Sequence, residues 1–364
     1  MLKRKTITLT LTRSCNLNCS YCFENHKSNK KMNMSMIESI LDKELVDPAF
    51  DEFEIDLFGG EPFLEFGLIK QTVEYVLKKF IGTKLIFCIT TNGTLVHGEI
   101  QDWLVKYKDW VICALSLDGT KRMQDINRCN CYDAIDIDFF AKTWPKQPMK
   151  MTVSAETLPY LSEGIIFMHE NNYAFTVNLA FDIDWSEQTN ASTLERELKI
   201  LIDYYLARPD ITPCTLLNVP IYFMASAAED EKFRQCGAGV EMFTYDADGK
   251  AYPCQFFMPL TLGDEKAEKA RSLVFPDEIS RDSFVGDCRT CKALEICHTC
   301  YGSNYASTGN IYEKDMNWCK LQKITFKANA YFRFKQIQNG TFKCEEDERP
   351  YWINGIHMLL TDFD

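Results

Sequence analysis

The stretch Cys15-Asn16-Leu17-Asn18-Cys19-Ser20-Tyr21-Cys22 sets three cysteines at the spacing C-x3-C-x2-C, directly after a β-type run over residues 6–12. Thiolates in such a set favour iron–sulfur chemistry. A [4Fe–4S] cluster held by three thiolates leaves one iron open to a substrate or cofactor. Structural zinc needs four ligands, but no fourth cysteine lies nearby and His26 is the only local imidazole. We therefore expect an iron–sulfur cluster rather than a zinc ion.

The composition narrows the class of protein. The chain has 364 residues, 46% hydrophobic and 25% charged, enough for one large domain and a smaller one. A net charge of -12 argues against nucleic acid as a partner. No apolar run reaches the ~18 residues of a membrane span, and no signal-peptide pattern precedes the first strand. We expect a cytoplasmic protein whose 16 cysteines bind metal rather than form disulfides.

Strand patterns alternate with helical patterns over about the first 210 residues. The expected strands are residues 6–12, 53–58, 85–90, 111–117, 149–154 and 175–181. The first expected helix opens at a capping box formed by Ser35 and Glu38. Alternating strands and helices predict a parallel sheet with right-handed crossovers. This part of the chain is therefore expected to form an α/β fold, a partial (β/α)6 barrel of the TIM type.

Glycine-rich or polar turns follow four of the expected strands at their carboxyl ends. They are the cysteine loop, Gly59-Gly60-Glu61, Thr91-Asn92-Gly93 and Ser116-Leu117-Asp118-Gly119. Each is an ordinary turn former by itself. In β/α barrels, however, the carboxyl ends of the strands carry the active site. We expect these four turns to form one site.

After about residue 215 the alternation stops and cysteines return. A hairpin is expected over 242–254 and a helix over 315–338, whereas residues 344–364 show no clear period. The cysteines of this region are too many for one tetrahedral metal site and indicate two. They are Cys236, Cys254, Cys288, Cys291, Cys297, Cys300 and Cys319. We expect a barrel domain at 1–215, a cysteine-rich domain at 216–325, and a helix end and tail at 326–364.

With these residues in hand, the chain resembles the radical S-adenosylmethionine enzymes of the branch that carries a SPASM domain. The resemblance rests first on the C-x3-C-x2-C motif with an aromatic residue, Tyr21, before its last cysteine. It implies that Cys15, Cys19 and Cys22 hold a [4Fe–4S] cluster whose open iron binds S-adenosylmethionine. It also implies a 5′-deoxyadenosyl radical that abstracts a hydrogen atom from an unactivated C–H bond.

The strand-end turns are similar to the cofactor-binding segments of that family. By this resemblance the residues that bind the cofactor are Tyr21, Gly59, Gly60, Glu61, Asn92, Ser116 and Arg128. The GGE turn would meet the methionine amino group, and Ser116 and Arg128 would meet the methionine carboxylate. Arginine suits that role because its planar guanidinium can bind a carboxylate through two parallel hydrogen bonds. No residue is indicated as the catalytic base.

The C-terminal cysteines are similar to the SPASM pattern, with one departure. Gly249 and Cys254 show the expected G-x4-C spacing, but two residues separate Cys297 from Cys300 where the pattern has three. The resemblance implies an outer auxiliary [4Fe–4S] cluster held by Cys288, Cys291, Cys297 and Cys319. It implies an inner cluster held by Cys236, Cys254 and Cys300, with one iron open. Three clusters are expected in all.

Other cysteines fall outside these sets. Cys88 and Cys113 lie in apolar strands and are expected in the core. Cys129 and Cys131 lie in a polar loop near the expected site and are candidates for functional thiols.

The SPASM branch acts mostly on peptides or on residues within proteins. We expect an enzyme that removes a hydrogen atom from a residue of a ribosomally made peptide and installs an oxidative cross-link, either a thioether or a C–C bond. The alternatives are an anaerobic sulfatase maturase that forms formylglycine, a radical peptide epimerase with Cys131 or Cys214 as hydrogen donor, and a non-enzymatic iron–sulfur electron carrier. The maturases have an Asp directly after the second SPASM cysteine, where this chain has Gln255.

The resemblance also implies partners. They are the peptide or protein substrate and an electron donor such as flavodoxin or ferredoxin. Few residues precede Cys15, so recognition of a leader peptide would need a separate protein or another surface of this chain. Neither nucleic acid nor a membrane is expected as a partner.

Overall fold

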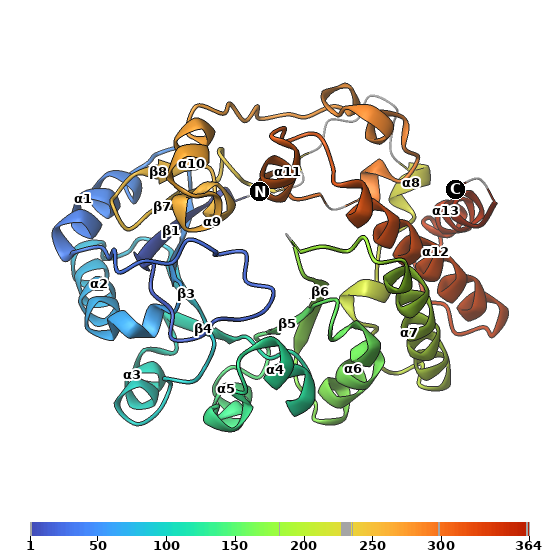
Figure 1. Cartoon of the computed structure of the whole chain (residues 1–364), viewed down its shortest axis with the longest axis horizontal. Coiled ribbons are helices and arrows are strands. Elements are labelled where there is room, and N and C mark those ends of the chain that lie inside the picture. The colour runs from blue at the N-terminus through green and yellow to red at the C-terminus, as the bar shows by residue number, and fades with distance from the viewer. Residues whose placement is uncertain are drawn as a thin grey trace. The chain divides into compact units, whose positions relative to one another are not determined.

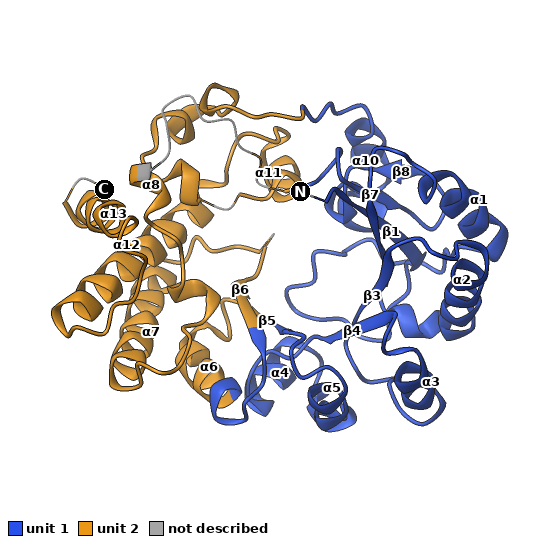
Figure 2. Ribbon diagram, turned by 180° about the vertical axis from the view of Figure 1, so that it is seen from behind, with its two compact units in different colours: residues 1–151, 168–175, 237–276 blue, residues 152–167, 176–236, 277–364 orange. Residues whose placement is uncertain are grey.

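The computed structural model describes residues 2–181, 183–226, 234, 236–297, 299–361 and 363. These residues form two compact units (Figure 2). Unit 1 comprises 1–151, 168–175 and 237–276, and unit 2 comprises 152–167, 176–236 and 277–364. The domain boundaries expected near residues 215 and 325 stay predictions.

The sheet of unit 1 has six strands in the described residues, in the order β4-β3-β2-β1-β7-β8 (Figure 1). The strands are β1 (Arg4–Thr12), β2 (Glu52–Gly59), β3 (Leu85–Thr91), β4 (Val111–Leu115), β7 (Met242–Tyr245) and β8 (Ala251–Tyr252). Strands β1 to β4 are parallel neighbours, β7 is parallel to β1, and β8 is antiparallel to β7. The carboxyl ends of β1 to β4 therefore meet at one edge of the sheet, where the four turns follow.

A second sheet in the described residues pairs β5 (Met149–Val153) with β6 (Phe175–Leu179). A single parallel bridge between Ser116 and Lys150 continues the strand order from the end of β4 to β5. Strands β1 to β6 thus follow one another in chain order, as right-handed crossovers favour. The prediction of an α/β fold with a mainly parallel sheet is confirmed.

Helices join the strands of unit 1. They are α1 (Met34–Glu44), α2 (Phe66–Lys79), α3 (Glu99–Tyr107), α4 (Lys121–Asn127), α5 (Ile137–Thr143), α9 (Pro259–Leu262) and α10 (Asp264–Ala270). The expected capping box of the first helix is wrong, since Ser35 lies inside α1. The side chain of Asn33 caps it instead, accepting a hydrogen bond from the N–H of Met36 at 3.0 Å. Asparagine is favoured there because the first N–H groups of a helix lack backbone partners.

Unit 2 is built mainly of helices. They are α7 (Gln188–Ala207), α8 (Phe223–Ser226), α11 (Tyr301–Thr308), α12 (Met316–Gln338) and α13 (Arg349–Thr361), while α6 (Leu161–Glu170) is shared with unit 1. No helix is predicted from the sequence for residues 344–364, and this interpretation is wrong because α13 lies there. In α13, Trp352, Ile356 and Leu359 recur at helical spacing and pack in one buried cluster with Phe326 and Ala330 of α12.

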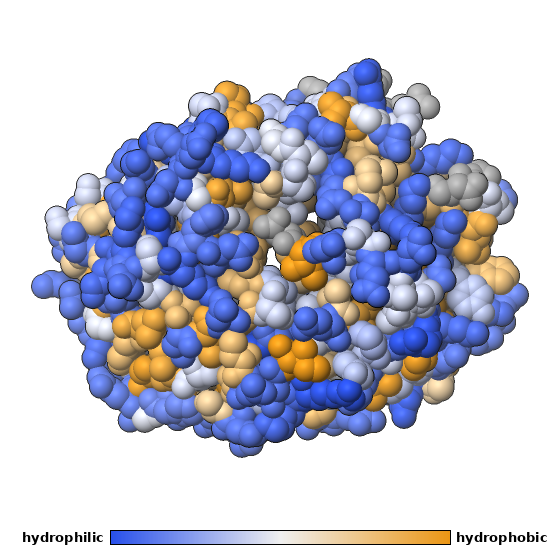
Figure 3. All heavy atoms as spheres, viewed as in Figure 1, coloured by the Kyte–Doolittle hydropathy of each residue, from blue (hydrophilic) through white to orange (hydrophobic). Residues whose placement is uncertain are grey.

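Two surface properties of the described chain follow from its composition. None of its helices is both long and apolar enough to cross a membrane. The face of the molecule seen in Figure 3 is mostly hydrophilic, in keeping with a charged fraction of 25%. The expected cytoplasmic location stays a prediction.

The hairpin expected over 242–254 is present as β7 and β8, and it extends the sheet of unit 1. A buried ion pair binds its turn to the start of the cysteine loop. Arg13 Nε donates to Asp246 Oδ1 at 3.0 Å, and a second guanidinium nitrogen donates to the other carboxylate oxygen. The two side chains are 4% and 0% exposed. Because each charge is buried, each depends on the other.

We predict that Asp246→Ala lowers the free energy of unfolding by about 3 kcal/mol, since it leaves the buried Arg13 guanidinium with only the exposed carboxylate of Asp264, at 3.7 Å, as a partner. Urea unfolding under anaerobic conditions, followed by circular dichroism, measures the change. The double variant Arg13→Met, Asp246→Leu should recover most of the loss. Equal instability of the single and double variants would show that the pair does not hold the hairpin turn to the loop.

Candidate functional site

The cysteine loop starts where β1 ends and returns to the same strand. The N–H of Arg13 donates to the Lys30 carbonyl at 2.9 Å, and the N–H of Met32 donates to the Leu11 carbonyl at 2.9 Å. Within the loop, Lys27 Nζ donates to the Leu17 carbonyl at 2.9 Å. The loop is therefore a closed structure anchored at both ends. Its three motif cysteines, Cys15, Cys19 and Cys22, are half-buried.

The chemistry of these thiols fits iron. Burial raises the pKa of Cys22 to about 11, and it raises the pKa values of Cys15 and Cys19 as well, while the positive charge of Lys27 opposes all three shifts. The thiolate is the form that binds metal. Metal binding at this loop must therefore release protons, as it does generally at thiol sites.

The two glycines of the GGE turn allow the turn to approach the cysteine loop closely. A Cβ atom added at Gly59 would lie 2.4 Å from the Thr12 carbonyl oxygen. A Cβ atom added at Gly60 would lie 2.4 Å from the Ser14 carbonyl oxygen and 2.9 Å from Cys15 Cβ. Only glycine fits at such distances. The end of β2 is thus packed directly against the first cysteine of the motif.

The Glu61 carboxylate joins the end of β2 to the end of β3. Its Oε1 accepts from Thr91 Oγ1 at 2.8 Å and from the Phe63 N–H at 3.1 Å, and its Oε2 accepts from the Asn92 N–H at 2.9 Å. A carboxylate can accept about four hydrogen bonds, so room is left for one further donor such as an ammonium group. Burial raises the pKa of Glu61 to about 7 despite these donors.

Asn92 continues the connection toward the cysteine loop. Its Nδ2 donates to Asn16 Oδ1 at 2.9 Å, and Asn16 Nδ2 donates to Thr94 Oγ1 at 2.8 Å. Asn92 is buried, at 7% exposure. The turn after β3 is therefore hydrogen-bonded to a residue that lies between the first two motif cysteines.

The turn after β4 is organised by Asp118, which is fully buried. Its Oδ2 accepts from Tyr21 Oη at 2.7 Å, from Asn127 Nδ2 at 3.0 Å and from Arg128 Nε at 2.9 Å. The Arg128 guanidinium also lies 5.3 Å from the centre of the Tyr21 ring. Ser116 is buried beside this group, and its N–H donates to the Thr91 carbonyl at 2.9 Å.

The predicted site residues of the N-terminal part are thus brought together in unit 1. Hydrogen bonds or close contacts connect the cysteine loop to each of the three following turns. Arg128 is paired with Asp118, and a guanidinium has five N–H donors, so this pairing leaves donors for a second carboxylate. The assignments of individual residues to parts of S-adenosylmethionine stay predictions.

Two residues of this site have no role predicted from the sequence. Asp118 is the first, although its position directly after a buried strand could have indicated a role. Glu24 is the second, and nothing in the sequence around it indicates one. Its side chain is 6% exposed, its Oε1 has no hydrogen-bond partner among the described residues, and burial raises its pKa to about 8. Glu24 is therefore a buried carboxyl, on the cysteine loop itself, with an oxygen open to a donor.

A second set of thiols lies in unit 2. The four cysteines assigned to the outer cluster line one cavity of about 310 Å³. They are Cys288, Cys291, Cys297 and Cys319, and all four are half-buried. Burial raises the pKa values of Cys288, Cys291 and Cys319, and the charge of Lys314 opposes each shift. Four thiols around one cavity with a cation among them fit a [4Fe–4S] cluster.

The three cysteines assigned to the inner cluster are distributed over both units. Cys254 is buried and lies two residues after β8 in unit 1, whereas Cys236 is exposed and Cys300 half-buried in unit 2. Cys300 precedes α11, and its Sγ accepts from the Ser303 N–H at 3.4 Å. Their assignment to one cluster stays a prediction.

Single-ion sites are not found in the described part of the chain. There, no group of three or more His, Cys, Asp or Glu side chains is placed to hold one metal ion. Thiolates on one zinc ion are about 3.8 Å apart, since the Zn–S bonds are about 2.3 Å long. In a four-iron cluster each thiolate binds a different iron, so the thiolates of one cluster stand farther apart than that.

The structure also shows the burial or the partners of the cysteines outside the two sets and of Asp246. Cys113 is buried as expected, but Cys88 is only half-buried. Cys129 is exposed, and its Sγ donates to the Asn18 carbonyl at 3.1 Å, so this thiol contacts the cysteine loop. Asp246 is committed to its buried partner Arg13.

Comparison with known proteins extends the likeness beyond single motifs. A family profile described as a 4Fe-4S single cluster domain matches residues 6–123, which contain the cysteine loop and the turns after β2, β3 and β4. The structure of native anSMEcpe with bound AdoMet and Cp18Cys peptide superposes with a TM-score of 0.68 at 18% identity, over 93% of this chain and 100% of that chain. At this identity the likeness concerns the fold.

Three sequence relatives have been compared with this chain over their matched lengths. The radical SAM cyclopropyl synthase TigE of Paramaledivibacter caminithermalis is 22% identical over 375 residues, 94% of this chain and 76% of that protein. A cysteine-type anaerobic sulfatase-maturating enzyme of Clostridium perfringens is 25% identical over 325 residues, 78% of this chain and 84% of that enzyme. An uncharacterised protein of Methanocaldococcus jannaschii is 31% identical over 189 residues, 49% of this chain and only 62% of that protein's length.

We predict that ionisation of Glu61 makes the fold less stable as pH rises. The carboxyl titrates near pH 4.5 in the unfolded chain and about 7 in the folded protein. Between these values the unfolded chain loses the proton first, so the free energy of unfolding should fall by about 3 kcal/mol as pH rises from 4.5 to 7.

Glu61→Gln should remove this component, and urea unfolding at pH 5 and pH 8 measures it. Glu74→Gln, on an exposed position of α2, is the matched control and should keep the wild-type dependence on pH. If Glu61→Gln also kept it, Glu61 would not be the titrating group.

Proposed function

We propose, from its relationship to the radical S-adenosylmethionine maturases, that this chain is an enzyme that removes a hydrogen atom from a residue of a ribosomally made peptide and leaves an oxidative cross-link. The observation that carries the proposal is the presence of two separate thiol sets. One lies on a loop hydrogen-bonded to three strand-end turns, and the other lines a cavity in unit 2. An enzyme that only transfers one electron to S-adenosylmethionine would need only the thiol set on the loop.

The residues of unit 1 would hold and orient the cofactor. Cys15, Cys19 and Cys22 would hold a [4Fe–4S] cluster, which with S-adenosylmethionine supplies the radical that takes a hydrogen atom from the substrate. The free acceptor position of Glu61 would receive the methionine ammonium. The donors of Arg128 not used by Asp118 would receive the methionine carboxylate, because a guanidinium binds carboxylates in pairs. Burial of this site keeps water from the reacting groups.

The thiols of unit 2 support an oxidative outcome. When a C–H bond loses a hydrogen atom and the product then loses a proton, one electron must still leave. A cluster held by Cys288, Cys291, Cys297 and Cys319 would be its acceptor, and an inner cluster held by Cys236, Cys254 and Cys300 would make three in all. A balanced product then lacks two hydrogen atoms and carries a new bond, either a thioether or a C–C bond.

The substrate class is proposed from the relatives. TigE is named as a cyclopropyl synthase and the Clostridium perfringens relative as a sulfatase-maturating enzyme. We favour peptide cross-linking over formylglycine formation because Gln255 stands where a maturase has its Asp, and because Asp246, in the hairpin turn before it in the sequence, is committed to Arg13. Electrons would come from a flavodoxin or ferredoxin, and either a separate protein or another surface of this chain would bind the leader of the peptide.

We predict that replacing Cys15, Cys19 and Cys22 by Ala abolishes formation of 5′-deoxyadenosine from S-adenosylmethionine. Protein purified without oxygen should be brown and hold about twelve irons, the sum of three [4Fe–4S] clusters. The triple variant should hold about eight. Chromatography of the nucleoside products and iron analysis measure both effects. Undiminished 5′-deoxyadenosine formation by the triple variant would refute the assignment of this loop.

A second test distinguishes the substrates. A candidate substrate, sought in a short open reading frame beside the gene, should lose two hydrogen atoms per cross-link, about 2 Da by mass spectrometry, whereas a sulfatase peptide should stay unchanged. The variant Gln255→Asp should process the neighbouring peptide no better than the wild type. Conversion of the sulfatase peptide to formylglycine by the wild type would show that the enzyme is a sulfatase maturase instead.

A further inference from the structure

Lys314 lies between α11 and α12 with its side chain turned into the interior of unit 2. The residue is 7% exposed, and its Nζ donates to Cys297 Sγ at 2.7 Å. Lys314 also lines the cavity of the four cysteines together with Cys288. Long charged side chains are almost never fully buried unless they are paired. The position of Lys314 therefore indicates that its charge belongs to the thiol set.

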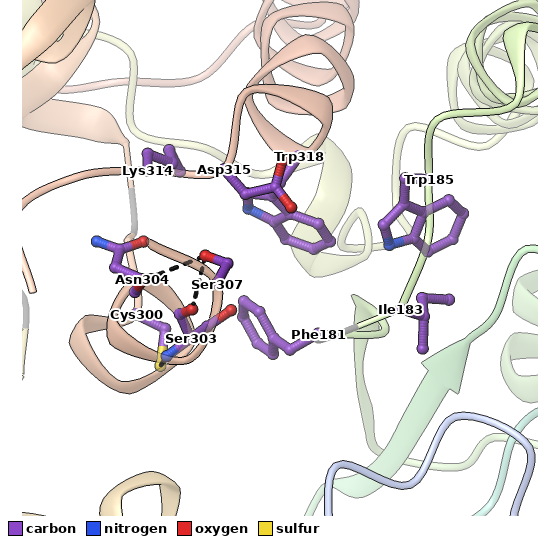
Figure 4. A pocket seen from close by; sticks show the side chains of 10 residues that line it. All are labelled: Phe181, Ile183, Trp185, Cys300, Ser303, Asn304, Ser307, Lys314, Asp315 and Trp318. Carbon is purple, nitrogen blue, oxygen red and sulfur yellow. Dashed lines mark hydrogen bonds between the residues drawn. The ribbon is translucent and has the colours of Figure 1, made fainter. Parts of the chain in front are cut away.

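Lys314 lines two cavities of unit 2. One is the cavity of the four cysteines. The other is lined by Cys300, which precedes α11, and by the rings of Phe181 and Trp318, whose centres lie 4.9 Å apart (Figure 4). Lys314 thus stands between the cysteines assigned to the outer cluster and a cysteine assigned to the inner one. A charge in that position acts unequally on the two sets, because the Nζ atom that carries it is hydrogen-bonded to Cys297 of the outer set.

The electrostatic consequence has a definite sign. Each thiolate and each added electron makes the cysteine set more negative, and a buried cation stabilises the more negative state. Hydrogen bonds to the cluster sulfurs act in the same direction, and both are recognised determinants of iron–sulfur potentials. Lys323 lines the same cavity but is less buried, with its Nζ 5.4 Å from the centre of the Phe363 ring. Water screens its charge more strongly than that of Lys314.

We propose that Lys314 is a positioning residue that raises the reduction potential of the cluster held by Cys288, Cys291, Cys297 and Cys319. It does so by donating a hydrogen bond to the Cys297 sulfur and by placing a positive charge inside the cavity. The inference rests on the proposed function insofar as that function places a cluster there. It adds the direction of electron transfer to that function. Because its potential is raised, the outer cluster is the preferred final acceptor of the electron that leaves the substrate.

The test is a redox titration of the full chain followed by electron paramagnetic resonance. The Cys15, Cys19 and Cys22 to Ala background removes the signal of the N-terminal cluster, and neither S-adenosylmethionine nor peptide is added. We expect Lys314→Met to make reduction of the outer cluster at least tenfold less favourable, about 59 mV for one electron. Lys314→Arg, which keeps the charge and the donors, should stay close to the parent. Lys323→Met, the matched control in the same cavity, should shift the potential less.

Iron content is measured on every variant, which separates the possible outcomes. An unchanged potential in Lys314→Met with its irons retained overturns the inference. If Lys314→Met loses irons, Lys314→Gln takes its place, because Gln keeps an N–H donor without the charge; a potential equal to that of the parent then overturns the inference. Absence of irons from Cys288, Cys291, Cys297 and Cys319 in the parent overturns the proposed function, and the inference with it.

Discussion

The buried carboxylate of Asp118 is the group on which the arrangement of the N-terminal site depends. It accepts hydrogen bonds from Tyr21, Asn127 and Arg128. The cysteine loop and the C-terminal end of α4 are therefore both bound to the carboxylate that follows β4. Glu61 has the same role between the ends of β2 and β3. Buried carboxylates are costly unless they are hydrogen-bonded and paired. The need to satisfy these two groups therefore holds the loops to one edge of the sheet.

Local sequence was sufficient for the sheet but not for the pairing of polar groups. The parallel strands and their turns were predicted because alternate burial, as in β2, has a period of two that short windows contain. The partners of Asp118 and the ion pair of Arg13 with Asp246 were not predicted, since the latter residues are 233 positions apart and nothing local connects them. Helix α13 was missed because an acidic run precedes Trp352 and hides the apolar spacing.

Each of the two thiol sets has a lysine side chain close to its cysteines. Lys27 is a cation close to the N-terminal cysteines, and Lys314 is a cation close to the cysteines of unit 2. Sequence could indicate the C-terminal set by its spacing, whereas the lysine inside its cavity became visible only in three dimensions. Under the proposed function the first site starts the reaction by giving up an electron, and the second ends it by accepting one. Differences in charge and hydrogen bonding around the sulfurs are the means by which one chain can separate these tasks.

The most direct test of the central claim is electron paramagnetic resonance of the reduced protein with only the N-terminal cluster present. The cysteines at 288, 291, 297 and 319 and those at 236, 254 and 300 are replaced by Ala, and spectra are recorded with and without S-adenosylmethionine. We expect S-adenosylmethionine to change the signal, because it binds the iron that has no protein ligand. A spectrum that stays the same at saturating S-adenosylmethionine would contradict it.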